Sequence, residues 1–184
     1  MEVSQNTNLK MIDKSIKFFG INIAILTISD TRNFDNDKSG STLRRLVEDC
    51  GHTCILRDIV KDEPKELLSI FNKWTNNKNL DVIITTGGTG LTGRDITVDV
   101  LETYFDKKID GFGELFRFIS YKKIGTSTIQ SRAIAGTKNG KYIFCLPGSP
   151  SACKDAWEEI LKFQLDIRHK PCNFVEIMPR LNEA

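Results

Sequence analysis

Long apolar runs are missing from this chain of 184 residues. No stretch approaches the roughly 18 residues that a membrane-spanning helix needs, and residues 1–17 are polar, without the apolar core of a signal peptide. We therefore expect a cytoplasmic protein with no membrane partner. We also expect residues 1–17 to be a flexible N-terminal segment and residues 18–184 to form a single domain, because a chain of this length suits one domain.

Paired cysteines and histidine clusters are missing as well. The five cysteines are odd in number and contain no C-x-x-C pair, so neither a disulfide framework nor a zinc site is expected. Cys145 lies in an apolar run, which indicates a buried, reduced thiol. His52 and His169 have no partner pattern, and no Ser-His-Asp or Cys-His arrangement is visible. Hydrolysis by an activated nucleophile is therefore unsupported.

A strong bias of charge is the third absence. The net charge is +2, and no stripe of lysine and arginine with interleaved aromatic residues is present. This excludes an argument for a nucleic-acid partner. With 40% hydrophobic and 27% charged residues, the composition is that of an ordinary globular protein.

Short apolar segments alternate with segments that have helical spacing in the first half of the chain. Strands are expected at Ile21–Ile28, Thr53–Val60 and Val82–Thr86. Ser39 is expected as the N-cap of a helix that ends at Gly51, and Asp62 or Glu63 should open the next helix, with Pro64 in its first turn.

The second half of the chain continues the alternation and adds a hairpin. Helices are expected over Thr97–Tyr104 and Gly113–Ser120, and from Pro150 to near Lys162. Ala133–Lys138 and Tyr142–Leu146 read as strands around an Asn139-Gly140 turn, whereas the tail from Pro171 looks irregular. Together these predict an α/β fold with a mostly parallel sheet, an antiparallel strand, and helices on both faces.

A cluster of small and hydroxyl residues follows the third strand. Thr86, Gly87, Gly88, Thr89 and Gly90 come at its carboxyl end, where ligands bind in open α/β sheets. Glycines allow successive N–H groups to converge on an anion, and the threonines add hydroxyl donors. The loop predicts a site for a phosphate-bearing ligand. The alternative is an ordinary glycine turn between a strand and a helix.

Two carboxylates lie near this loop. Asp95 comes five residues after Gly90, and Asp62 follows the second strand, at the same sheet edge. Mg²⁺ is commonly held by one or two carboxylates together with substrate phosphates, so Asp95 is a candidate metal ligand. The alternative is that each carboxylate only caps the helix that follows it.

The same glycines also match a different motif. Gly88 to Gly93 fits G-x-G-x-x-G, the dinucleotide fingerprint, but it follows the third strand rather than the first. An oxidoreductase that uses NAD would need a strand directly after the helix at Thr97–Tyr104, and none is evident. The loop is not a P-loop, because Lys and Ser/Thr do not follow its last glycine.

Two further segments could bind anions. The turn Pro147-Gly148-Ser149 precedes Pro150, so Ser149 can cap a helix whose N-terminus offers free N–H groups. Ser131-Arg132 precedes a strand, and arginine suits bidentate binding of phosphate. The alternatives are a ligand-free helix start and a surface arginine.

Several of these motifs occur together and in order. They are Ile25 to Thr31, Thr86 to Gly90, Arg94 to Thr97, Ser131-Arg132, and Pro147 to Pro150. The set resembles the MoaB/MogA family of molybdenum cofactor synthesis over roughly Ile21 to Phe174. The stretch Gly125 to Ala133 and the tail Arg168 to Phe174 are closer to the MoaB branch.

The resemblance implies a three-layer α/β/α fold and a molybdopterin-binding domain that assembles as a homo-trimer or homo-hexamer. It implies Mg²⁺-dependent transfer of AMP from ATP to molybdopterin, with release of pyrophosphate. Contact with other proteins of the pathway is a further implication. An alternative is a non-catalytic oligomeric scaffold that binds molybdopterin without turnover.

The resemblance also assigns roles to residues. Asp95 matches an essential aspartate and Asp62 a second acidic position, so both would act in catalysis and hold the metal. The loop Gly87 to Gly90 and the turn Pro147 to Ser149 would hold phosphate and nucleotide. Ser131 and Arg132 would bind the pterin phosphate. The remaining residues, Ser29, Asp30 and Thr31, would line the same pocket.

Overall fold

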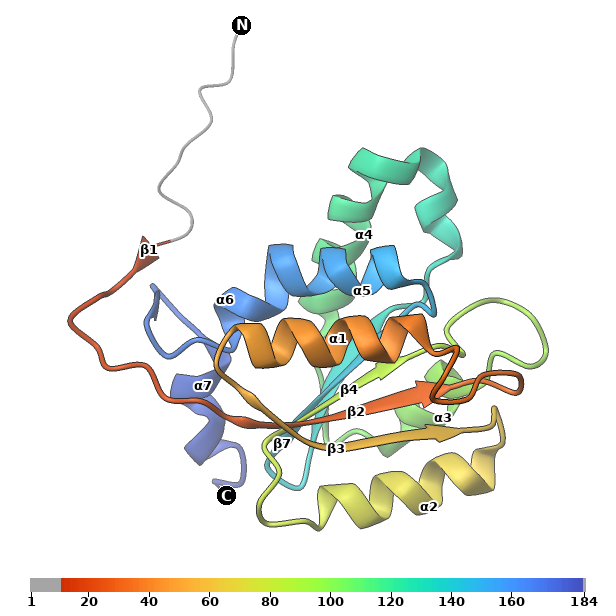
Figure 1. Cartoon of the computed structure of the whole chain (residues 1–184), viewed down its shortest axis with the longest axis horizontal. Helices are drawn as coiled ribbons and strands as arrows, with labels where there is room; N and C mark the ends of the chain where they lie inside the picture. The colour runs from red at the N-terminus through yellow and green to blue at the C-terminus, as the bar shows by residue number, and fades with distance from the viewer. Residues whose placement is uncertain (1–10, 184) are drawn as a thin grey trace, which may run out of the picture.

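The computed structural model describes residues 11–183 of the chain. A flexible segment was predicted over residues 1–17, and residues 1–10 of it lie outside the described residues. Residues Met11–Ile12 form a short strand, β1, which pairs antiparallel with β8, His169–Lys170. The N-terminal segment thus runs beside a segment from near the C-terminus (Figure 1).

A six-stranded sheet in the order β3-β2-β4-β7-β6-β5 forms the centre of the fold. Its strands β2, β3, β4 and β7 are parallel, whereas β6 and β5 are antiparallel to their neighbours. A turn at Asn139-Gly140 joins β6 to β7, as the sequence predicts. The bounds in chain order are Asn22–Ile28 for β2, Thr53–Val60 for β3, Val82–Thr86 for β4, Lys107–Lys108 for β5, Ile134–Lys138 for β6 and Lys141–Leu146 for β7.

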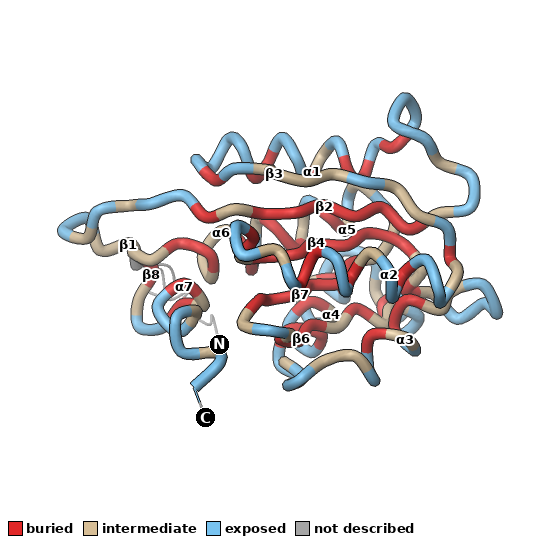
Figure 2. Tube along the Cα trace, turned by 90° about the horizontal axis from the view of Figure 1, so that it is seen from below, coloured by how far each residue is buried: buried red, intermediate tan, exposed pale blue. Residues whose placement is uncertain are grey.

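Helices cover both faces of the sheet. Successive strand residues point to opposite sides, and in β2 most residues of both sides are apolar and buried. Ile23 and Ile25 pack in one buried cluster, and Ala24 and Leu26 pack in the other. The first cluster lies under α1 (Lys38–Asp49), α4 (Asp110–Ile124) and α5 (Pro150–Ala156). The second lies under α2 (Pro64–Thr75) and α3 (Thr97–Tyr104). Figure 2 shows the buried strands between these layers. The predicted α/β fold is confirmed.

The helical segment that begins at Pro150 runs on to Gln164. It passes from α5 through a π-helical turn, Trp157–Leu161, into α6, Lys162–Gln164, so the predicted end near Lys162 is confirmed. The helix predicted at Gly113–Ser120 is longer, because α4 extends to Ile124 and a 3₁₀ helix, Gly125–Gln130, follows it.

The prediction of an irregular tail is wrong. Residues Phe174–Ile177 form α7, and Met178–Arg180 form a 3₁₀ turn. The side chain of Asn173 caps α7 by accepting from the Glu176 N–H, at 2.8 Å. The Phe174 ring packs on Tyr142 of β7, with ring centres 4.8 Å apart. Contacts with residues distant in sequence therefore order this segment, and local periodicity does not report them.

The N-cap of α1 is Asp37, so the prediction of Ser39 is wrong. The Asp37 carboxylate accepts from the Gly40 N–H at 3.0 Å, which satisfies one of the helix's unpaired donors. Ser39 lies within the first turn and donates its hydroxyl to the carbonyl of Gly148, at 2.8 Å.

The Asp37 carboxylate is also the centre of a buried polar network. It accepts from the Thr27 hydroxyl of β2 at 2.7 Å and from the Arg57 guanidinium of β3 at 2.9 Å. Burial, the largest single influence, raises the pKa of Asp37, but the hydrogen bonds from Gly40, Thr27 and Arg57 lower it below its ordinary value. Asp37 therefore joins the start of α1 to two strands.

The replacement Asp37→Asn removes the negative charge that pairs with the Arg57 guanidinium but keeps a side chain that can cap α1. We expect the free energy of unfolding at pH 7 to fall by about 2 to 4 kcal/mol. The loss should shrink as the pH falls through the lowered pKa of Asp37, because wild type then loses the same charge. Urea unfolding measures both effects. Asp35→Asn, in the exposed part of the same loop, is the control. Equal stability of the two variants would contradict this role.

Candidate functional site

Four strand ends meet at one edge of the sheet. Ile28 of β2 lies beside Val60 of β3, and Thr27 lies beside Thr86 of β4, which in turn lies beside Leu146 of β7. Because these strands are parallel, the loops that follow them leave the sheet side by side. Such an edge is where open α/β sheets bind ligands.

A hollow of about 390 Å³ lies at this edge. The structure brings together in its lining the predicted loop Gly87–Gly90, the turn Pro147–Ser149, Asp95 and Ser131. The sequence analysis did not predict a further group of lining residues from α4, the 3₁₀ helix and α5. These are Phe116, Ser120, Ile124, Gln130 and Ala152. The apolar residues of α4 among them, Phe116 and Ile124, belong to no sequence motif that indicates ligand binding.

Two loop positions require glycine. Gly87 and Gly88 have φ angles of 108° and 64°, in the left-handed region that disfavours side chains. A Cβ on Gly87 would lie 2.1 Å from the carbonyl oxygen of Ile28. A Cβ on Gly88 would lie 2.1 Å from Thr97 Oγ1 and 2.4 Å from Asp62 Oδ1. The glycines thus allow the loop to pass directly over the strand end and the Asp62 carboxylate.

The two predicted threonine donors differ in their contacts. Thr86 Oγ1 donates to the carbonyl of Pro147 at 2.9 Å, which ties the glycine loop to the neighbouring turn. Thr89 is buried, and its carbonyl accepts from the Arg132 N–H at 3.3 Å. The Thr86 hydroxyl therefore holds together two segments that line the hollow.

Asp62 is a buried carboxylate with an unsatisfied oxygen. Its Oδ1 has no hydrogen-bond partner in the described part of the chain. Burial, followed by the negative charges of Asp30 and Asp95, raises the pKa of Asp62 to about 6. An unpaired buried charge is costly, so this position favours a proton or a cation.

Asp95 differs from Asp62 in that it is well paired. It accepts from the N–H of Thr92 at 2.9 Å and from the Thr92 hydroxyl at 2.6 Å. The hydroxyl hydrogen bond is the main cause of its lowered pKa, which keeps the group ionised at neutral pH.

Neither Asp62 nor Asp95 acts as a helix cap, so the capping alternative is wrong for both. The N-caps of α2 and α3 are Glu63 and Ile96, and neither helix has a side-chain cap.

Arg132 and Ser131 have different surroundings. Arg132 donates to the carbonyls of Gly90 at 2.7 Å and Asp95 at 2.5 Å, and to the Asp99 carboxylate at 2.8 Å. Its guanidinium thus holds the loop between Gly90 and Asp95 in place. The Ser131 hydroxyl lines the hollow, is buried, and has no partner within residues 11–183.

The three residues after β2 lie next to this hollow but do not line it. Ser29 and Asp30 line a second hollow of about 360 Å³. Asp30 accepts from the Arg94 guanidinium, which also binds Glu63 at 2.9 Å. The Thr31 N–H donates to Ser29 Oγ at 3.3 Å.

Two residues that position the Pro147–Ser149 turn were not predicted. Arg32 donates to the carbonyl of Gly148 at 2.9 Å, and Ser39 donates to the same oxygen. Ser149 itself accepts from the Ala152 N–H at 3.2 Å and so caps α5, as predicted. No spacing in the sequence reveals the contacts of Arg32 and Ser39, because more than 100 residues separate them from Gly148.

The topology around Gly88 to Gly93 differs from that of a dinucleotide-binding motif. A strand, β5, does follow α3, but it has only two residues and pairs antiparallel with β6 at the far edge of the sheet. The glycines therefore lie outside a compact βαβ unit.

In the described chain, no helix is both long and apolar enough to cross a membrane.

The fold and this site define a class of protein. The sequence matches the family described as "Probable molybdopterin binding domain" over residues 24–167, and the chain belongs to that family.

Individual relatives narrow the class. Molybdenum cofactor biosynthesis protein B of Escherichia coli strain K12 is 43% identical over 164 residues, which are 89% of this chain and 96% of that relative. A solved structure of molybdenum cofactor biosynthesis protein B matches with a TM-score of 0.81 and 36% identity, over 90% of this chain and 98% of that one. The tungsten cofactor synthesizing protein MoaB from Pyrococcus furiosus matches with a TM-score of 0.69 and 34% identity, over 77% and 91%.

These comparisons confirm the predicted resemblance to the MoaB/MogA family. They support a role in molybdenum cofactor biosynthesis.

The raised pKa of Asp62 leads to a test in metal-free protein. Folding favours the protonated group, so its contribution to stability is complete below its ordinary pKa of 3.8 and is lost as the pH rises through about 6. We expect Asp62→Asn to be more stable than wild type at pH 8 by about 1 to 2 kcal/mol beyond any difference at pH 5. Urea unfolding with a chelator measures this. A stability difference that does not change with pH would show that burial does not raise the pKa of Asp62.

Proposed function

We propose that this protein transfers AMP from Mg-ATP to the terminal phosphate of molybdopterin. The observation that carries the proposal is the pair of carboxylates beside the glycine loop: Asp62, buried and unsatisfied under Gly88, and Asp95 facing Gly90. The loop and the carboxylates meet at the edge where a phosphate ligand would bind. Membership of the family and the implications of its resemblance supply the substrates.

The residues present fit a magnesium ion shared with a ligand. Within residues 11–183, no cluster of three or more His, Cys, Asp or Glu side chains could hold a metal alone. Two carboxylates completed by phosphate oxygens and water are the usual arrangement for Mg²⁺. Asp62 and Asp95 would hold it, and the bound ion would offset the negative charge of the phosphates.

The reaction needs positioning more than acid–base chemistry. An oxygen of the pterin phosphate attacks the α-phosphorus of ATP, a new P–O bond forms, and the bond to pyrophosphate breaks. The N–H groups of Gly88 and Thr89 in the glycine loop and of Gly148 and Ser149 in the neighbouring turn would hold phosphate oxygens. The free hydroxyl of Ser131 would bind the pterin phosphate at the same hollow. Arg132 would act through the loop that it holds.

The surface of α4 supports the implied assembly into a homo-trimer or homo-hexamer. Large apolar side chains are exposed along this helix, at Leu115, Phe118, Tyr121 and Ile124. A contiguous exposed apolar surface is typical of a protein interface. Figure 1 shows the end of α4 extending beyond the other helices.

The direct test is an adenylylation assay with Asp95→Asn. Purified protein is mixed with Mg-ATP and molybdopterin, and adenylylated pterin and pyrophosphate are measured. We expect Asp95→Asn to reduce kcat/KM about 100-fold or more, because one of two carboxylate ligands is lost. Asp49→Asn, at the exposed C-terminal end of α1, is the matched control and should keep wild-type turnover.

Two outcomes of this assay would contradict the proposal. Full turnover by Asp95→Asn would remove the metal-binding role of that carboxylate. Pterin binding by wild type without any consumption of ATP would favour the non-catalytic scaffold.

A further inference from the structure

The loop between β2 and α1 presents an exposed phenylalanine beside the second hollow. Phe34 is 56% exposed. It lines the hollow of about 360 Å³ together with Ser29, Asp30 and Arg32. A single exposed aromatic side chain is common on protein surfaces, so the significance of Phe34 lies in the hollow that it lines.

The backbone that carries Phe34 is fixed without the help of its ring. Asn33 Oδ1 accepts from the N–H groups of Asp35 at 3.0 Å and Asn36 at 3.2 Å. In return, Asn36 Oδ1 accepts from the Asn33 N–H at 2.8 Å. The loop is thus held by its own asparagine side chains and does not depend on the Phe34 ring for its shape.

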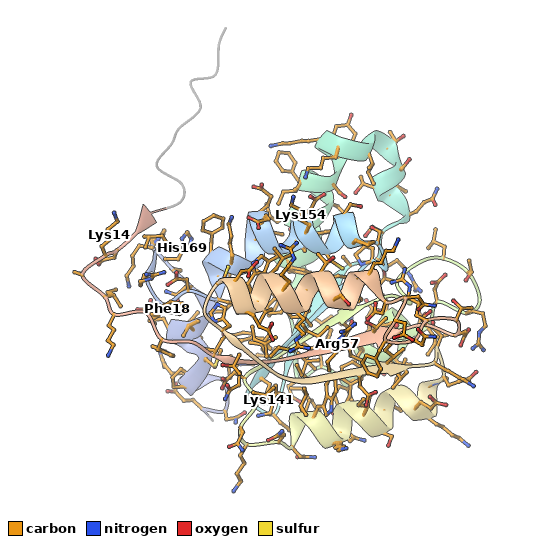
Figure 3. All side chains as sticks on the ribbon, viewed as in Figure 1. Lys14, Phe18, Arg57, Lys141, Lys154 and His169 are labelled. Carbon is orange, nitrogen blue, oxygen red and sulfur yellow. The ribbon has the colours of Figure 1, made fainter. Side chains whose placement is uncertain are left out.

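Arg57 supports the ring from the sheet. Its guanidinium carbon lies 5.2 Å from the centre of the Phe34 ring, a cation–π distance. Arg57 is fixed in turn by Asp37 at 2.9 Å and by Ser41 Oγ at 3.0 Å. Figure 3 labels Arg57, which lies near α1. The ring therefore has a fixed cationic support and an exposed surface.

The second hollow adjoins the glycine-loop hollow. Arg32 lines the second hollow and donates to the carbonyl of Gly148, which lines the first. Ser29 lines the second hollow and follows Ile28, whose carbonyl lies against Gly87. A ligand that crosses this shared wall could place a phosphate at the glycine loop and a flat ring at Phe34.

We propose that Phe34 is the stacking platform for the base of the bound nucleotide. The inference rests on the proposed function and adds the location of the base. Base–aromatic stacking accepts any nucleobase. Arg32 and Lys61 line this hollow together with Asp30 and Glu66, so its charges balance, which suits an uncharged base. The pterin is assigned to the other side, because Ser131 lines the glycine-loop hollow but not this one.

Calorimetric titration with two probes separates stacking from phosphate binding. With Mg²⁺ present, Phe34→Ala should bind ATP about 5- to 30-fold more weakly than wild type and should bind tripolyphosphate, which has no base, as wild type does. Phe19→Ala is the matched control, since Phe19 is 52% exposed but does not line the hollow. Circular dichroism confirms that each variant is folded.

A spectroscopic readout uses Phe34→Trp. Both native tryptophans, Trp74 and Trp157, are buried, so the introduced indole would be the exposed fluorophore. We expect ATP to quench this fluorescence and tripolyphosphate to leave it unchanged. The variant should bind ATP at least as tightly as wild type.

The outcomes distinguish this inference from the proposed function. If Phe34→Ala loses ATP affinity but wild type adenylylates nothing, the platform stands and the catalytic proposal fails. If adenylylation occurs and Phe34→Ala leaves both the KM for ATP and the affinity unchanged, the platform is overturned. Failure of wild type to bind ATP, or quenching by molybdopterin alone, also overturns it.

Discussion

Asp62 imposes the strongest constraint on this site. Its carboxylate is buried at the end of β3, has an oxygen without a partner in the described chain, and lies within the electrostatic influence of Asp30 and Asp95. Proteins rarely keep such a group unless a proton or a cation neutralises it. Asp62 also contributes to the requirement for glycine at position 88, where φ is 64° and a side chain would collide with both Thr97 and Asp62. The glycine loop and the carboxylate are therefore one structural unit.

Arginines hold the loops of this unit from outside. Arg132 binds two carbonyls of the Gly90 to Asp95 segment, Arg32 binds the Gly148 carbonyl, and Arg94 joins Asp30 to Glu63. Their guanidinium groups are largely engaged with the protein's own oxygens. In the proposed site, the positive charge that offsets a phosphate ligand would come from backbone N–H groups and a bound cation. In this arrangement the arginines hold the loops and a cation would lie between the carboxylates and the phosphates, so an acidic cluster is compatible with a phosphate site.

Local patterns predict most of this fold, because its elements follow short-range rules. The buried strands Asn22–Ile28 and Val82–Thr86 are nearly continuous apolar runs, and the Asn139-Gly140 turn has a specific backbone geometry. The parallel alternation then brings the glycine loop, the Pro147–Ser149 turn and Asp95 to one edge. The errors arise where distant residues decide. Asp37 replaces Ser39 as a cap within a network that includes Thr27 and Arg57, and Phe174 orders the tail through Tyr142. The contacts of Arg132 with the carbonyls of Gly90 and Asp95 likewise join residues distant in sequence and cannot be read from a local pattern.

The central claim is that Asp62 and Asp95 bind a divalent cation together with a phosphate ligand. Electron paramagnetic resonance of Mn²⁺, used in place of Mg²⁺, tests it most directly by counting bound ions in the presence of ATP. The account predicts one tightly bound Mn²⁺ per chain when ATP is present, and at least a tenfold weaker site in Asp62→Asn. Binding of Mn²⁺ that is the same in wild type and in this variant would contradict it.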